Sequence, residues 1–210
     1  MAGHLRSAAG LPPDGQATGG IGLLGAGRES FLSRQESADG RGRFRDADPA
    51  AHAARPGVER NDADDHAKAF IAWLDQQPSV AKNRKVGTQG YCMGGPIAFR
   101  TSAAVPDRVG AVASFHGGGL VTKEPNSPHL QAAKTKASFL VAIAANDDTR
   151  APNDKTVLKE TFEKAKLNAE IEVYADALHG WCPPDSTVYS EPKAEKAWSR
   201  LLALYGKALA

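Results

Sequence analysis

The sequence predicts an α/β protein with a mostly parallel sheet and helices on both of its faces. Two observations support this class. Short strands are predicted at residues 85–89, 109–115, 138–145 and 170–175, and amphipathic segments with helical spacing separate them. The second and third are mostly apolar, as in buried strands, whereas the fourth alternates as an edge strand does. Strands that alternate with helices form parallel sheets with right-handed crossovers, which places helices on both faces.

The predicted helices follow from the spacing of apolar residues and from their end signals. The first begins near residue 63, where Asp62, Asp64 and Asp65 suit the positive end of the helix dipole, and Pro78 follows its end. Its apolar residues recur at helical spacing: Ala67, Phe70, Ile71 and Leu74. Further helices are predicted at residues 95–104, 153–167 and 192–208, and a polar turn at 146–152.

Composition excludes several classes of partner. The 210 residues are enough for one substantial core, and a net charge of +2 with mixed signs gives no indication of nucleic acid or of a charged membrane surface. The two cysteines, Cys92 and Cys182, belong to no metal-binding spacing, so we expect a reducing compartment and no metal. No apolar run is long enough to span a membrane, and residues 1–24 lack a signal-like apolar centre. We therefore expect a soluble, cytoplasmic protein of undetermined oligomeric state.

The most informative stretch is the pattern Gly-x-Cys-x-Gly at Gly90 to Gly94, between a predicted strand and a predicted helix. This pattern is typical of a nucleophile elbow, a sharp turn that holds the reactive side chain in a strained conformation and needs small flanking residues. Gly90 and Gly94 are the predicted small positions. The nearby helix N-terminus favours a thiolate, so Cys92 is the candidate nucleophile.

Candidate catalytic residues also follow two later strands. Ligands bind beyond the carboxyl ends of parallel strands, where Asp147 and Asp148 follow the third run and His179 follows the fourth. The order nucleophile, acid, histidine is that of α/β-hydrolases. An oxyanion formed by attack on a carbonyl needs preorganised donors. We expect the backbone amide of Met93 to be one of them and a loop near the N-terminal end of the fold to supply the other.

Gly90–Gly95, the turn from Asp148 to Pro152 and His179-Gly180-Trp181 resemble the dienelactone hydrolase family, over roughly residues 58–210. The resemblance implies an α/β-hydrolase-like fold and cleavage of a small ester or lactone through a thioester, with no cofactor. It implies that Cys92 is the nucleophile and His179 the general base and then acid. In this family the acid lies a few residues before a proline, which selects Asp148 as the group that orients the imidazole.

Three aromatic residues are assigned to the substrate pocket, namely Tyr91, His116 and Trp181. For Tyr91 and Trp181 the alternative is packing in the core, and for His116 it is a turn after a strand. Cys92 could itself be a small buried hydrophobe. The alternative functions are an inactive or incomplete hydrolase-fold protein that binds a ligand without turnover, and a redox-sensing thiol.

Two features depart from the family pattern. No basic residue follows His179 in Trp181 to Pro184, so an ester or lactone other than a dienelactone is expected. Residues 1–57 show no sustained periodicity where the family has strands and an oxyanion loop. Their composition is typical of a disordered segment. Alternatively they are translated out of frame: residues 29–34 can be encoded by codons that, read one nucleotide later, give Asn-Pro-Phe-Tyr-Arg-Val, and family members resemble this run after an early strand. Residues 58–210 are then the catalytic domain, with N-terminal strands missing or scrambled.

Overall fold

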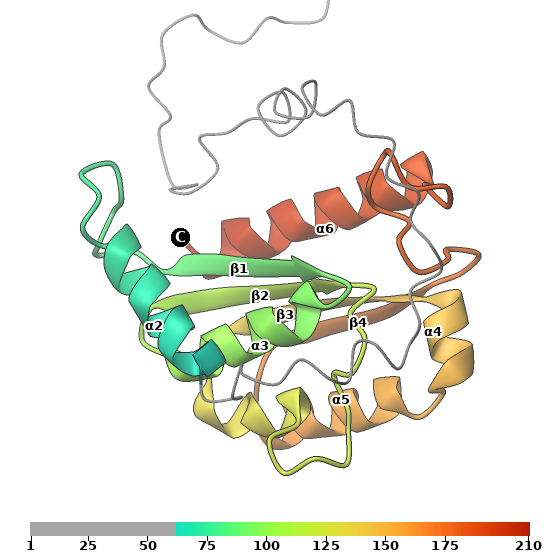
Figure 1. The fold of residues 1–210 in the computed structure, drawn as a ribbon, viewed down its shortest axis with the longest axis horizontal. Coiled ribbons are helices and arrows are strands. Elements are labelled where there is room, and N and C mark those ends of the chain that lie inside the picture. The colour runs from blue at the N-terminus through green and yellow to red at the C-terminus, as the bar shows by residue number, and fades with distance from the viewer. Residues whose placement is uncertain (1–61) are drawn as a thin grey trace, which may run out of the picture.

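A computed structural model of the chain describes residues 62–210 (Figure 1). The predicted segment 1–57 lies outside this part of the chain. The described residues contain one sheet of four parallel strands in the order β1-β2-β3-β4. The strands are β1 (Val86–Tyr91), β2 (Val109–Phe115), β3 (Ser138–Ala144) and β4 (Ala169–Tyr174). The predicted α/β class is confirmed.

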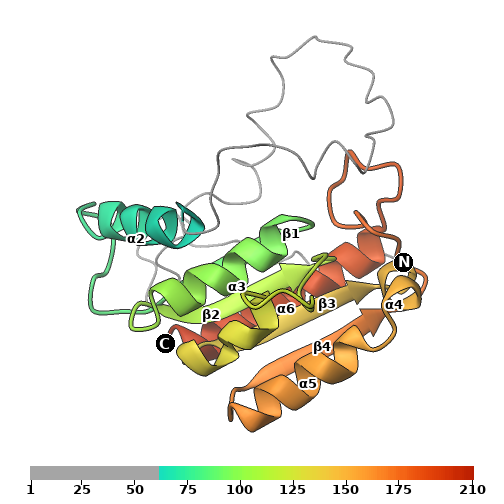
Figure 2. The ribbon, with the colours of Figure 1, turned by 60° about the horizontal axis from the view of Figure 1, so that its bottom comes forward.

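Helices cover both faces of the sheet, as the two views show (Figures 1 and 2). Helix α6 (Glu191–Ala208) lies on one face, against β2 and β3. The opposite face carries α2 (Asp62–Leu74), α3 (Gly94–Ala104), α5 (Asp154–Lys164) and the 3₁₀-helix η2 (Pro128–Lys134). None of the described helices is long and apolar enough to cross a bilayer.

The strands divide their side chains between two core layers because successive residues point to opposite faces. Phe139 and Val141 of β3 pack with Phe99 of α3 and Phe162 of α5. Leu140 and its alternate neighbours on β3 pack beneath α6 instead. Burial on both faces explains why β2 and β3 read as nearly continuous apolar runs rather than as alternating ones.

The structure changes three details of the sequence prediction. The polar turn after β3 is a short helix, α4 (Ala145–Arg150), and the loop after β2 contains η2. On α2, Ala67 and Ile71 are buried, whereas Phe70 is 68% exposed and does not share their face. Helices α4 and η2 are only six and seven residues long, so their environment rather than their local pattern determines their structure.

The corner between β1 and α3 is built on close backbone packing. A Cβ atom on Gly90 would lie 2.0 Å from the carbonyl oxygen of Gly94, and one on Gly95 would lie 2.3 Å from Ser114 Oγ. A Cβ on Gly94 would meet no atom of residues 62–210 within 4 Å. The elbow therefore requires glycine at positions 90 and 95, while the expected need for a small residue at position 94 is not supported by its packing.

We predict that Gly90→Ala lowers the free energy of unfolding by about 1–3 kcal/mol, as overpacking does, because the new methyl group collides with backbone that cannot move aside. Gly94→Ala is the matched control and should change it by less than about 1 kcal/mol, since alanine also favours the helix. Urea unfolding measures both. Equal midpoints for the two variants would contradict the packing argument.

Candidate active site

Cys92 occupies the strained position at the end of β1. Its φ angle is 52°, in the left-handed region that residues other than glycine rarely adopt, and the residue is exposed. The Cys92 backbone N–H donates to Phe115 O at 3.1 Å, and Gly95 N–H donates to Cys92 O at 3.1 Å. The strand ladder and the first helical turn thus hold the backbone on both sides of an accessible thiol, which is the geometry of a nucleophile elbow.

The parallel register brings the strand ends together. Tyr91 of β1 pairs with Phe115 of β2, so the residues that follow them, Cys92 and His116, lie side by side. Ala144 of β3 pairs with Tyr174 of β4, which places α4 beside the loop that carries His179. The chemistry-bearing residues are therefore gathered at the carboxyl edge of the sheet, as expected for this class.

His179 is held by two neighbours from the start of α4. Its backbone N–H donates to Asn146 Oδ1 at 2.9 Å, and its Nδ1 lies 2.6 Å from Asp147 Oδ2. The side chain of Asp147 is 17% exposed, so water competes little with this contact. An Nδ1–H that donates to a carboxylate leaves the lone pair on Nε2, which is the tautomer that a general base needs.

The structure pairs His179 with Asp147 and not with Asp148. Asp148, which the family resemblance selected, forms an ion pair with Lys155, whose Nζ lies 2.6 Å from Asp148 Oδ2. Adjacent residues of a helix point about 100° apart, because the helix has 3.6 residues per turn, so only one of the two aspartates faces His179. That residue is Asp147. The sequence contained both candidates, but no local signal distinguished their directions.

His116 lies between Cys92 and His179. Its Nδ1 accepts a hydrogen bond from Cys92 N–H at 3.2 Å, and its ring centroid is 4.8 Å from that of His179. The residue is 3% exposed and has a φ angle of 42°. Burial, with a contribution from nearby His179, lowers the pKa of His116 to about 4. A direct contact with the nucleophile backbone was not part of the sequence prediction.

The other two predicted pocket residues occupy different environments. Trp181 is fully buried in the core, with its ring stacked on Tyr174 at 5.2 Å and edge-on to His116 at 5.0 Å. It supports the site from behind, contrary to its predicted place on the pocket wall. Tyr91 is 38% exposed and stacks on Phe115 at 4.9 Å, and burial raises its pKa to about 12.

The predicted oxyanion donor is in a suitable place. Met93 immediately precedes the first residue of α3, and its backbone N–H has no hydrogen-bond acceptor within residues 62–210. A free amide beside the nucleophile, at the start of a helix, can donate to a developing oxyanion. The predicted second donor, from an N-terminal loop, falls outside the described residues.

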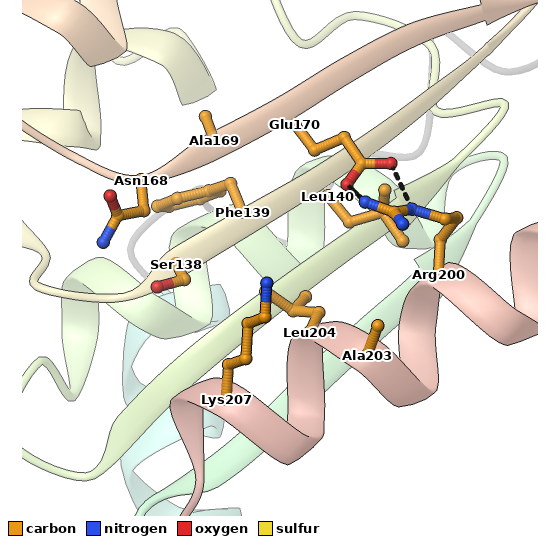
Figure 3. A pocket seen from close by; sticks show the side chains of 10 residues that line it. All are labelled: Ser138, Phe139, Leu140, Asn168, Ala169, Glu170, Arg200, Ala203, Leu204 and Lys207. Atoms are coloured by element: carbon orange, nitrogen blue, oxygen red, sulfur yellow. Dashed lines mark hydrogen bonds and ion pairs between the residues drawn. The ribbon is translucent and has the colours of Figure 1, made fainter.

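A pocket lies elsewhere, at the opposite end of the sheet (Figure 3). It is formed by the amino ends of β3 and β4 and by α6, and Arg200 in its wall donates to Glu170 Oε1 at 2.6 Å. None of the predicted site residues lines it. Among residues 62–210, no group of three histidine, cysteine or acidic residues could hold a metal ion.

Comparison with known proteins identifies relatives of this arrangement. The model of the dienelactone hydrolase family matches residues 30–209, which extends beyond the domain boundary predicted at residue 58. A Synechocystis protein named "putative carboxymethylenebutenolidase" is 30% identical over 141 residues, covering 66% of this chain and 56% of the relative. A protein of the same name from Escherichia coli is 29% identical over 116 residues, covering 54% of this chain and 42% of its own.

Solved structures share the fold. A crystal structure titled putative dienelactone hydrolase, from Klebsiella pneumoniae, aligns with a TM-score of 0.57 and 25% identity, over 68% of this chain and 58% of that one. A dienelactone hydrolase-like promiscuous phosphotriesterase from metagenomic libraries aligns with a TM-score of 0.61 and 21% identity, over 72% and 64%. The chain thus spans a little more than half the length of the Synechocystis relative and under two thirds of these structures.

We predict that iodoacetamide alkylates Cys92 but not Cys182 in the folded protein at about pH 8, near the reference pKa of a free thiol. Cys92 is exposed, whereas burial raises the pKa of Cys182 to about 12 and keeps it a thiol. Mass spectrometry should find one adduct on the wild type, none on Cys92→Ala, and one on Cys182→Ala. Two adducts at equal rates on the wild type would contradict the difference in environment.

Proposed function

Because the chain belongs to the dienelactone hydrolase family, we propose that it hydrolyses a small ester or lactone through Cys92, His179 and Asp147. The observation that carries the proposal is the 2.6 Å contact between His179 Nδ1 and Asp147 Oδ2, at the same edge of the sheet as the strained Cys92 elbow. A nucleophile, a base and a group that orients the base are the components of covalent acyl transfer.

The proposed reaction has two halves. Cys92 gives its proton to His179 Nε2, and the sulfur attacks the substrate carbonyl to form a tetrahedral oxyanion, which accepts a hydrogen bond from Met93 N–H. The C–O bond of the ester breaks, and the leaving alkoxide takes the proton from His179. Water then loses a proton to His179, attacks the thioester, and releases the acid and the Cys92 thiol. Asp147 stabilises the imidazolium in both halves.

The surroundings favour certain substrates. The run after His179, from Trp181 to Pro184, contains no basic residue to pair with a substrate carboxylate. We therefore propose an ester or lactone other than a dienelactone. Tyr91, which is partly exposed beside the elbow, is the proposed contact for the substrate, whereas Trp181 and His116 lie behind it.

The second candidate is a hydrolase-fold protein that binds a ligand without turnover. Within the described residues Met93 N–H is the one oxyanion donor that we assign. A site with a single donor can bind a ligand without completing the oxyanion hole. A redox-sensing thiol at Cys92 is distinguished by reversible oxidation without ester cleavage.

We predict that the wild type hydrolyses p-nitrophenyl acetate with a burst followed by steady turnover, because an activated ester should acylate Cys92 faster than water hydrolyses the thioester. Cys92→Ala should abolish both phases, and Cys182→Ala should preserve them, since Cys182 is a partly buried thiol. Stopped-flow absorbance measures the two phases. Identical slow rates for wild type and Cys92→Ala would support binding without turnover.

We further predict that Asp147→Asn lowers kcat by at least about 100-fold, towards the ~10⁴-fold loss that such a change can cause in a triad, because the amide favours the wrong histidine tautomer. Asp148→Asn is the matched control, since it removes only the ion pair with Lys155. Its kcat should stay within about threefold of the wild type, as expected for a partly exposed ion pair. A larger loss for Asp148→Asn than for Asp147→Asn would reverse the assignment.

A further inference from the structure

We propose that His116 is a positioning residue. It holds the Cys92 backbone through Nδ1 and packs its ring against His179, and so fixes the position of the Cys92 thiol relative to the His179 imidazole. The inference rests on the proposed function of that site. It assigns to His116 a task other than lining the substrate pocket, because a residue that is 3% exposed offers little surface to a substrate.

The first argument is the hydrogen bond to the elbow. Cys92 N–H is shared between Phe115 O at 3.1 Å and His116 Nδ1 at 3.2 Å. The first acceptor continues the strand ladder, whereas the second is a side chain that reaches back from the end of β2. Cys92 has a strained backbone, which persists only when its surroundings determine it strongly. His116 provides one of those constraints.

The second argument concerns the protonation of His116. A backbone N–H can only donate, so the Nδ1 atom that receives it must carry a lone pair. The neutral ring therefore has its proton on Nε2, and protonation of Nδ1 would break the contact with Cys92. Burial lowers the pKa of His116 to about 4, which keeps the ring neutral at ordinary pH.

The third argument concerns the neighbours of His116. The titratable groups that face it are His179 from the loop after β4, Asp147 from α4 and Tyr91 from the end of β1. In the proposed reaction His179 becomes an imidazolium 4.8 Å from the His116 ring centre. A second cation at that distance would oppose this step, whereas a neutral ring does not. The proximity to His179 thus requires a histidine that stays uncharged.

The fourth argument is that His116 itself cannot move far. Its backbone N–H donates to Ala142 O of β3 at 2.8 Å, and its ring is edge-on to the fully buried Trp181. The residue therefore links the ends of β1, β2 and β3 to the loop that carries His179. A displacement of about 1 Å between reacting groups can lower a rate about 100-fold, so such a link affects catalysis without touching the substrate.

The test compares His116→Asn with His116→Gly. Both residues tolerate the left-handed backbone at position 116, but only asparagine offers an oxygen where Nδ1 now stands. We expect His116→Gly to slow alkylation of Cys92 by iodoacetamide by about tenfold or more, and to lower kcat for p-nitrophenyl acetate with KM changed less than about threefold. His116→Asn should restore both rates to within about threefold of the wild type.

His129 provides a matched control. It is also a buried histidine whose Nδ1 hydrogen bonds, in this case with Ser127 Oγ at 2.7 Å, but it lies in η2. His129→Gly should lower the melting temperature without changing the alkylation rate of Cys92 in the folded protein. Comparison of His129→Gly with His116→Gly therefore distinguishes loss of Cys92 positioning from a general loss of stability.

Two results would overturn the positioning role: alkylation of His116→Gly at the wild-type rate, or no recovery in His116→Asn. The alkylation series does not depend on turnover. If the wild type shows no ester hydrolysis but the series behaves as expected, the proposed function fails while the placement of the Cys92 thiol by His116 stands.

Discussion

The close approach of helix α3 to the end of β2 is the constraint on which the site depends. Gly95 and Gly117 leave room for each other and for the buried hydroxyl of Ser114, and Gly90 leaves room for the first turn of the helix. Only because these backbones nearly touch can the chain turn directly from β1 into α3. The turn forces the left-handed conformation of Cys92 and presents its side chain at the edge of the sheet.

The position of His179 depends on a different anchor, the buried core beneath its loop. Ala145 N–H donates to Ala177 O at 2.8 Å, and Ser190 N–H donates to Trp181 O at 3.1 Å, so both ends of the loop are tied. Trp181 itself is inaccessible to solvent and stacks on Tyr174. Burial of the large Trp181 side chain, two residues after His179, stabilises the loop in one conformation and so fixes the position of the imidazole.

Much of the fold could be predicted from the sequence, because each strand buried on both faces is a short apolar run and each long helix has an apolar face. The predicted strands and long helices all occur in order, from α2 through α6. The exceptions are α4 and η2, which are one or two turns long. Segments of that length have little periodicity of their own, and packing against the rest of the molecule determines them.

The sequence by itself determined the positions of Cys92 and His179 at strand ends, because glycine spacing and strand order are local patterns. Only the tertiary structure shows that Asp147 contacts His179 while Asp148 contacts Lys155, since two adjacent side chains of a helix point in different directions. The contact of His116 with the Cys92 backbone was likewise invisible, because it arises from the register between β1 and β2, a property of two strands paired in space.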